Sequence, residues 1–427
     1  MASVIRFPLA QATPTFAAKP KPRIALSLAG GGPLGAIYEI GALCALQEAL
    51  DGIDFTRLDH YIGVSAGSFI AASLAKGMSP QELCKSFIDN TESESYEHSD
   101  RFDPAWLMRP AFGEFARRAI QLPGLLAAAA WRATAERKSI ISALELLGPA
   151  LPTGIFSNAE VNTRMAKIFA QPGRSNDFRE LQKIRGSRLT LIATNLDSGE
   201  AAPFGAPGWD HVPISQAVQA SSALPGLFPP VEIGEHYFLD GALKKTLHAS
   251  VALDEGMDLV ICLNPLVPFD ALNARPAVMQ RGLPKERQRI PRIIEGGLPA
   301  VLSQTFRSMI HSRLEMGMKA YERQYPQTDI VLFEPDHRDP EMYLANTFSY
   351  SQRASLAEHA YQQTRHLLRA RRSSLTEKFE RHGIVINDAV LSDPKRQLVM
   401  PAPKATAVGK AVGRLEETLE DLERRYA

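Results

Sequence analysis

The sequence predicts an α/β protein in which helices flank a mainly parallel central sheet. Two strand–turn–helix units follow one another within the first 80 residues, and apolar, strand-like runs recur through the rest of the chain. Strands that alternate with helices favour a parallel sheet, because each helix carries the chain back across the sheet. The 427-residue chain is 45% hydrophobic and 22% charged, the balance of a globular protein with a large core.

The two opening units have the same order of elements. Each begins with a short apolar run typical of a buried strand, turns at small residues, and continues with apolar residues at helical spacing. The strand, turn and helix are expected at residues 23–29, 30–32 and 34–50, and again at 58–64, 65–67 and 68–76.

The region from about 90 to 185 is mostly helical and less regular. Prolines at 110, 123 and 152 punctuate it, and residues 122–131 (LPGLLAAAAW) are apolar and uncharged. We interpret it as a helical insertion or lid over one end of the sheet. Further strands are predicted at 188–194, 231–239, 258–263 and 329–333, and further helices at 215–222, 291–325 and 352–381.

The chain is expected to have three parts. A flexible leader, interrupted by prolines, covers residues 1–22, the main domain covers 23–350, and a C-terminal helical extension and tail cover 351–427. The tail contains a Pro/Ala/Lys-rich linker and a short charged helix at 414–425.

Composition excludes several classes of function. The formal net charge of +1 argues against a nucleic-acid binder that depends on overall positive charge. Cys44, Cys84 and Cys262 are too few and too scattered for a disulfide framework or a metal site, so they are expected to be buried, in a reducing compartment. We therefore expect a cytoplasmic protein without a metal or cofactor. Residues 122–131 have half the length of a membrane-spanning helix, so any membrane contact would be peripheral.

The first candidate catalytic motif is Gly63-Val64-Ser65-Ala66-Gly67, a G-x-S-x-G between a predicted strand and a predicted helix. A serine on such a sharp turn exposes its hydroxyl, and the crowded backbone around it requires small neighbours such as Gly63 and Gly67. The N-terminus of the following helix favours negative charge at this point. Ser65 is therefore the candidate nucleophile.

A second motif, Gly30-Gly31-Gly32, also joins a strand to a helix. It lacks the Lys-Ser/Thr ending of a phosphate-binding P-loop and the spacing of a dinucleotide-binding motif. Consecutive glycines let backbone N–H groups approach a developing alkoxide closely. We interpret the three glycines as an oxyanion hole.

The third motif is Asp240-Gly241-Ala242, directly after the predicted strand at 231–239. An aspartate at the end of a strand faces the region where α/β sheets place their sites. Such a turn is common, and it indicates a catalytic aspartate only in combination with the other two motifs.

Together these motifs resemble the patatin-like phospholipase family over roughly residues 23 to 350. The resemblance rests on AGGGPLG, GVSAGS, the segment 220–231 (ASSALPGLFPPV) and LDGA, in this order and spacing. It implies a patatin-like fold and a Ser65–Asp240 dyad without histidine, which would hydrolyse lipid acyl esters without a metal. An aspartate near its ordinary pKa of about 3.9 is a weak base, so an apolar pocket that raises the pKa would help.

The sequence departs from the family pattern at two positions of the glycine loop. Members often carry an acid where this chain has Ala29, and a cation where it has Leu34. An α/β-hydrolase triad is the alternative, since His248, His311 and His337 follow Asp240 in the required order.

A basic stretch follows the predicted strand at 258–263. This stretch contains six cations and one acid, a balance that would favour docking on an anionic membrane. The cations are Arg275, Arg281, Lys285, Arg287, Arg289 and Arg292. A second basic run lies at 366–372 (HLLRARR).

The sequence thus predicts a phospholipase A or a lysophospholipase-like enzyme. Two alternatives stay open: an esterase acting on triacylglycerol, a storage polyester or a thioester, and a catalytically silent lipid-binding protein. The oligomeric state is not predicted.

Overall fold

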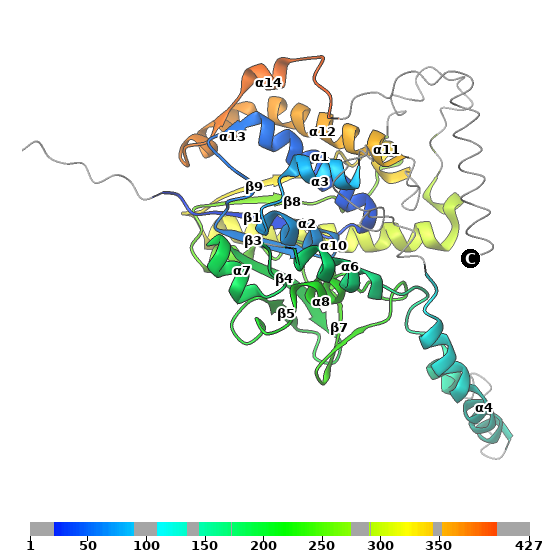
Figure 1. Cartoon of the computed structure of the whole chain (residues 1–427). Helices are drawn as coiled ribbons and strands as arrows, with labels where there is room; N and C mark the ends of the chain where they lie inside the picture. The colour runs from blue at the N-terminus through cyan, green and yellow to red at the C-terminus, as the bar shows by residue number, and fades with distance from the viewer. Residues whose placement is uncertain are drawn as a thin grey trace, which may run out of the picture.

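The computed structural model contains one eight-stranded sheet with helices on both faces (Figure 1). It describes residues 21–88, 109–134, 145–171, 173–274, 290, 292–344 and 352–398. The strand order is β6-β7-β4-β3-β1-β8-β9, and β5 pairs with β4 outside this path. The predicted α/β fold with a mainly parallel sheet is confirmed.

Five strands form the parallel part of the sheet. They are β1 (Ile24–Leu28), β3 (His60–Val64), β4 (Arg188–Asn195), β8 (Leu259–Leu263) and β9 (Asp329–Phe333). All residues of β1, β3 and β8 are buried, which explains why their sequences are apolar throughout rather than alternating.

The other three strands are antiparallel and form one edge: β5 (Ala201–Phe204), β6 (Val231–Ile233) and β7 (His236–Asp240). The single strand predicted at 231–239 is therefore wrong. Gly234, with a φ of 63°, turns the chain there into a hairpin. The sequence analysis also missed β5.

Each face of the sheet carries its own core. On one face Leu26 and Leu28 of β1 pack in a cluster with α1 (Gly32–Ala49), α2 (Ala66–Ala75) and α12 (Arg353–Ala370). On the other face Ala25 and Ala29 pack with α9 (Ser250–Asp254) and Leu314 of α10 (Gly297–Gln324). The main remaining helices of the body are α3 (Pro80–Phe87) and α8 (Ile214–Ser221).

The described parts of region 90–185 are helical, but they differ in how they pack against the core. The region holds α4 (Phe112–Thr134), the 3-10 helix η3 (Glu145–Ala150), α6 (Ala159–Phe169) and α7 (Phe178–Arg185). Phe169 and Phe178 belong to the main core, whereas α4 extends away from the body (Figure 1). Pro123 lies inside α4 and does not break it, contrary to the expectation from the sequence. The extent of the insertion and its role as a lid stay predictions.

The C-terminal helices pack directly on α1. The predicted helix at 352–381 is two helices, α12 and α13 (Arg372–Glu380), and the one predicted at 291–325 begins as the 3-10 helix η7 (Ile293–Gly296) before α10. The short helix α11 (Pro340–Leu344) precedes α12, and β10 (Val385–Ile386) and α14 (Asp388–Ser392) follow α13. The strand β10 pairs with β2 (Leu50–Asp51).

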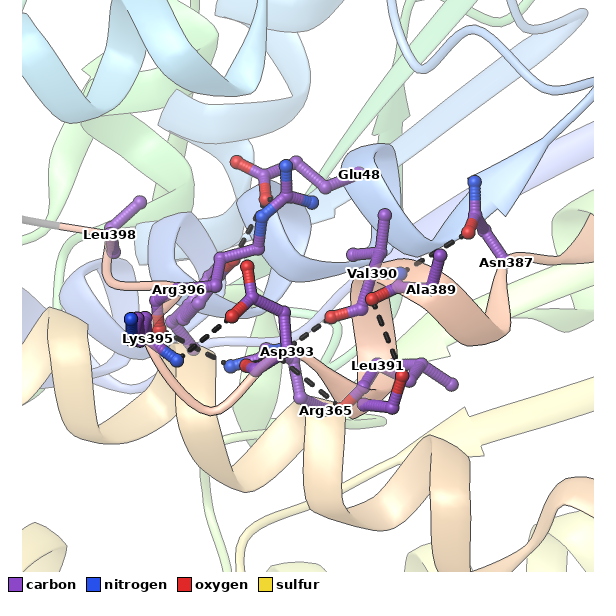
Figure 2. Close-up of polar contacts among 12 residues, drawn as sticks. Glu48, Arg365, Asn387, Ala389, Val390, Leu391, Asp393, Lys395, Arg396 and Leu398 are labelled. Atoms are coloured by element: carbon purple, nitrogen blue, oxygen red, sulfur yellow. Dashed lines mark hydrogen bonds and ion pairs between the residues drawn. The ribbon is translucent and has the colours of Figure 1, made fainter.

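Arg365 of α12 binds the last described residues of the chain through hydrogen bonds (Figure 2). Its buried guanidinium donates to the carbonyl oxygens of Val390 and Asp393, both at 2.7 Å. Nearby, Arg396 lies 3.3 Å from the Glu48 carboxylate at the end of α1. The chain beyond α13 is thus tied to the first helix of the molecule.

Several predicted features fall outside the described residues. They are most of the leader, the charged tail helix at 414–425, and the basic side chains of 275, 281, 285, 287 and 289; only Arg292 of that stretch is described, and it is exposed. Within the described ranges, no helix is both long and apolar enough to cross a bilayer.

Candidate active site

Ser65 occupies a strained turn between β3 and α2. Its φ of 54° and ψ of −124° place it in a conformation that L-residues rarely adopt. The turn leaves no room for side chains at its glycines: a Cβ on Gly63 would lie 2.5 Å from Ser68 Cα, and one on Gly67 would lie 2.5 Å from the Ala29 carbonyl oxygen. A strained serine with no room for side chains beside it is the geometry that a nucleophile elbow requires.

The backbone of Ser65 is held by other serines. Its N–H donates to Ser221 Oγ at 2.8 Å, and that hydroxyl donates in turn to the carbonyl oxygen of Ile192 at 2.6 Å. Ser68 N donates to the Ser65 carbonyl at 2.9 Å. The sequence analysis missed this contact of Ser221, although the residue lies within the segment 220–231 on which the family resemblance rests.

The register of the sheet brings the three motifs into one row. Leu28 of β1 pairs with Gly63, so Gly30 comes level with Ser65 two residues later. Val64 pairs with Ile192 of β4, and the next β4 residue, Ala193, pairs with Asp240 of β7. Segments far apart in the sequence thus meet at the same end of the sheet.

The glycine loop lies against the Ser65 side chain. A Cβ on Gly30 would lie 2.8 Å from Ser65 Cβ and 3.4 Å from its Oγ, and one on Gly31 would lie 2.8 Å from Pro265. Gly32 begins α1 with a φ of 60°. Among the described residues, the N–H groups of Gly30 and Gly31 donate to no other protein group. Donors of this kind, at the N-terminus of a helix, suit a developing negative charge.

The two departures from the family pattern have structural explanations. Ala29 is buried, donates its N–H to the Leu263 carbonyl at 3.1 Å, and accepts from Gly67 N at 3.1 Å. Its backbone therefore links the loop to both β8 and the elbow without a charged side chain. Leu34 is buried in the main core, where a cation would lose its hydration.

Asp240 ends β7 beside Ser65, with only 2% of its surface exposed. Its Oδ1 accepts from Ala242 N at 2.9 Å, its N–H donates to the Ala223 carbonyl at 3.0 Å, and its carboxylate lies within hydrogen-bonding reach of the Ser65 side chain. Burial raises the pKa of Asp240 to about 6, because it outweighs the hydrogen bonds from Ser65 and Ala242 that lower it. A carboxylate with this pKa is still ionised at neutral pH and is a better base than an ordinary aspartate.

The three histidines of the alternative triad lie apart from this pair. His248 is buried, its Nε2 is 3.4 Å from the Gly241 carbonyl oxygen, and burial lowers its pKa to about 4. His311 packs edge-on against His337 and lies 3.6 Å from Glu334. Within the described part of the chain, none of the three forms a hydrogen bond or an ion pair with Ser65 or Asp240.

Glu39 is a second buried carboxyl near the site, and the sequence analysis missed it. It lies on the first half of α1, is fully buried, and neither of its oxygens has a hydrogen-bond partner in the described chain. Burial raises the pKa of Glu39 well above its ordinary value. Its position on α1 gives no signal in the sequence, because one acid in an apolar helix resembles an exposed residue.

The described residues give no evidence of a metal centre. No group of three or more His, Cys, Asp or Glu side chains that could hold a metal ion occurs within them. Cys44, Cys84 and Cys262 are free and buried, as predicted.

Comparison with known proteins gives consistent relationships. A family model described as "Patatin-like phospholipase" matches residues 26–253. The chain is 23% identical over 241 residues to "Probable lipid hydrolase 463L" of Invertebrate iridescent virus 6, which covers 56% of this chain and 66% of the relative.

Two solved structures align with most of the chain at low similarity. VipD from Legionella pneumophila aligns with 82% of this chain and 67% of its own, at 20% identity and a TM-score of 0.36. The type III effector protein ExoU aligns with 82% of this chain and 53% of its own, at 16% identity and a TM-score of 0.35. The chain thus spans about two thirds of the length of the viral relative and about half of ExoU.

Proposed function

The chain belongs to the patatin-like phospholipase family, and on that basis we propose that it is a serine-dependent lipid acyl hydrolase. The observation that carries the proposal is the position of Ser65 on a strained turn beside the buried carboxylate of Asp240. We propose phospholipid as the substrate, cleaved in the manner of a phospholipase A or lysophospholipase.

Acylation follows from the geometry. Ser65 Oγ attacks the ester carbonyl while Asp240 accepts the hydroxyl proton. The N–H groups of Gly30, Gly31 and Gly32 and the N-termini of α1 and α2 stabilise the oxyanion that forms. The intermediate then expels the alcohol, a lysolipid in the case of a phospholipid, which leaves with the proton from Asp240.

Deacylation repeats the same steps with water. Asp240 removes a proton from a water molecule that attacks the acyl-enzyme, the oxyanion forms again at the glycine loop, and Ser65 leaves with the proton. The free fatty acid is released, and no metal or cofactor takes part in this scheme.

The elevated pKa of Asp240 supports its role as the base. Proton transfer from a serine is most efficient when the pKa of the base approaches the working pH while the base stays ionised. Burial provides this condition without a histidine.

Labelling with a fluorophosphonate probe tests the dyad. The wild-type protein should be labelled, whereas Ser65→Ala and Asp240→Asn should not, and thermal melting should show that both variants are folded. His248→Ala serves as the control and should be labelled as the wild type is.

Other outcomes would point elsewhere. Labelling that survives Asp240→Asn and is lost in His248→Ala would replace the dyad with a histidine triad. A folded wild-type protein that reacts with no probe would indicate a silent lipid-binding protein. If labelling follows the dyad, a panel of phospholipid, triacylglycerol, polyester and thioester substrates then separates phospholipase activity from the other esterase activities.

A further inference from the structure

The helix α4 has its polar side toward the protein and its apolar side toward the outside. Its buried residues are Glu114 and Ala129, and Glu114 Oε1 accepts from both Thr153 N, at 3.2 Å, and Thr153 Oγ1, at 2.9 Å. Arg118 donates to Glu114 at 2.9 Å and to the Pro149 carbonyl at 2.9 Å. A surface helix of a globular protein normally has the reverse arrangement.

The exposed side of α4 is widely apolar. At 3.6 residues per turn, the polar residues Glu114, Arg117, Arg118, Gln121 and Arg132 lie within an arc of about 100°. The exposed apolar side chains spread over about 180° on the other side: Phe112, Phe115, Ile120, Leu122, Leu126 and Trp131. Phe112, Ile120 and Trp131 are 74%, 80% and 67% exposed, so nothing in the described chain covers this face.

We propose that the apolar face of α4, defined by these six side chains, inserts into the surface of an anionic phospholipid membrane. Helices that lie in the membrane interface combine a wide apolar face containing Trp, Phe and Leu with arginine on the polar face. In α4 three arginines accompany a single acid, and residues 119–131 carry no charge. Arg117, whose side chain is 62% exposed beside Glu114, suits contact with an anionic headgroup.

A second exposed apolar surface favours a membrane, rather than a single protein, as the partner of α4. Ile294 of η7 and Leu298, Leu302 and Phe306 of α10 are also exposed. In Figure 1, α4 and the start of α10 both extend on the side of the molecule toward which β1 and β3 run, the side that carries Ser65. A membrane contacted through both surfaces would lie at the active-site end of the sheet.

The choice of lipid as the occupant rests on the proposed function, whereas the outward apolar face does not. The experiment therefore measures membrane binding and catalysis separately. Full-length protein is floated with vesicles of equal parts phosphatidylcholine and phosphatidylglycerol, and hydrolysis of soluble p-nitrophenyl butyrate is measured in parallel.

The test variant is Ile120→Glu combined with Trp131→Glu. We expect it to partition to vesicles at least about tenfold more weakly than the wild type, because two large apolar side chains no longer enter the membrane. Its hydrolysis of the soluble ester should match the wild type. The matched control is Ile184→Glu on α7, a 49% exposed apolar residue at the other end of the molecule (Figure 1), and it should bind as the wild type does.

Three results would overturn the proposal. These are a wild-type protein that does not float, a double variant that floats as the wild type does, and an Ile184→Glu control that is impaired equally. If the double variant floats normally but changes from dimer to monomer in sedimentation velocity, the face is a contact between two copies. A wild-type protein that floats through α4 but hydrolyses no ester would remove the proposed function and leave the membrane contact standing.

Discussion

At the scale of single residues, the buried carboxyl groups of Asp240 and Glu39 differ in their partners. Asp240 accepts a hydrogen bond from Ala242 and reaches Ser65. These interactions oppose the effect of burial, so the pKa of Asp240 is about 6. Glu39 has no hydrogen-bond donor in the described chain, and burial raises its pKa well above the ordinary value. The hydrogen-bonded carboxylate of Asp240 suits a base, whereas nothing in the described chain stabilises a charge on Glu39.

The pKa of Asp240 predicts how activity depends on pH. With Asp240 as the base, kcat/KM on a soluble ester should rise as the pH increases through about 6 and level off near pH 7, because only the ionised carboxylate accepts the serine proton. A pH–rate profile of the purified enzyme between pH 4.5 and 8 measures this. A midpoint near 4 would mean that burial does not raise the pKa, and one above 7 would indicate a different base.

Glu39 predicts a pH-dependent stability. Because its pKa is raised in the folded protein, its contribution to stability is complete below the ordinary glutamate pKa and is lost as the pH rises toward the folded value. Glu39→Gln cannot ionise, so the melting temperature of the variant should exceed that of the wild type increasingly above pH 5. Thermal melts across pH 4 to 9 check this.

The control for Glu39 is Glu377→Gln, whose side chain is 83% exposed. It should melt with the wild type at every pH. If Glu39→Gln is destabilised at all values of pH, the carboxyl makes a specific interaction that the amide does not replace.

At the scale of elements, the site depends on two tight strand-to-helix connections packed against each other. The elbow after β3 touches the glycine loop after β1 through Gly67 N and the Ala29 carbonyl, 3.1 Å apart. The two connections are coupled through this hydrogen bond, which would position the proposed oxyanion donors and the proposed nucleophile together.

A single methyl group in the glycine loop tests this coupling. Gly30→Ala places a Cβ within 2.8 Å of Ser65 Cβ, so either the loop or the serine must move. We expect kcat on a soluble ester to fall by about 10²-fold or more, the loss typical of a displaced oxyanion donor.

Gly113→Ala in α4 is the control for Gly30→Ala. A Cβ there would meet no atom within 4 Å, so activity on the soluble ester should not change. Steady-state kinetics of both variants decide the matter, and equal activity of Gly30→Ala and the wild type would mean that the loop adapts freely.

The elements that build the site could be predicted because they are buried on both sides. The runs RIALSLA and DLVICL lack alternation, which identifies central parallel strands, and the glycines around Ser65 mark the turns. The hairpin of β6 and β7 was missed because its turn at Gly234 lies inside a run of strand-forming residues. The outward apolar face of α4 was also not predictable, because periodicity shows that a helix has two faces but not which one meets the protein.

The resemblance predicted the pairing of Ser65 with Asp240, which the register of β3, β4 and β7 then brings together. Neither Ser221 nor Glu39 could be recognised from spacing. Ser221 is recognised only by its contact with Ser65, 156 residues away in the chain, and Glu39 only by its burial.

At the scale of the whole molecule, α12 is part of the catalytic fold rather than an appendage. Its backbone approaches α1 closely at Gly41, where a Cβ would lie 2.4 Å from the Ala357 carbonyl oxygen. Leu356, Tyr361 and Leu368 share the core of α1 and β1. The C-terminal extension therefore supports the helix that begins at the glycine loop.

Gly41→Val should separate these two helices. The larger side chain would collide with the backbone of α12, and we expect a loss of about 1–3 kcal/mol in the free energy of unfolding, measured by urea denaturation. Gly317→Ala is the control, since a Cβ at this helical glycine on α10 comes no nearer than 3.9 Å to a neighbour, and it should keep or gain stability. Equal stability of Gly41→Val and the wild type would mean that α12 contributes little to the fold.

The order in which the chain is synthesised determines when α1 can be packed. β1 receives its second neighbour only when β8 has been made, and α1, which also packs against α2 and α3, receives α12 only when residues beyond 353 have been made. During translation, Ser65 and Asp240 therefore leave the ribosome well before the layer that holds the glycine loop is complete. We expect a nascent chain to gain the proposed activity only after α12 has left the ribosome.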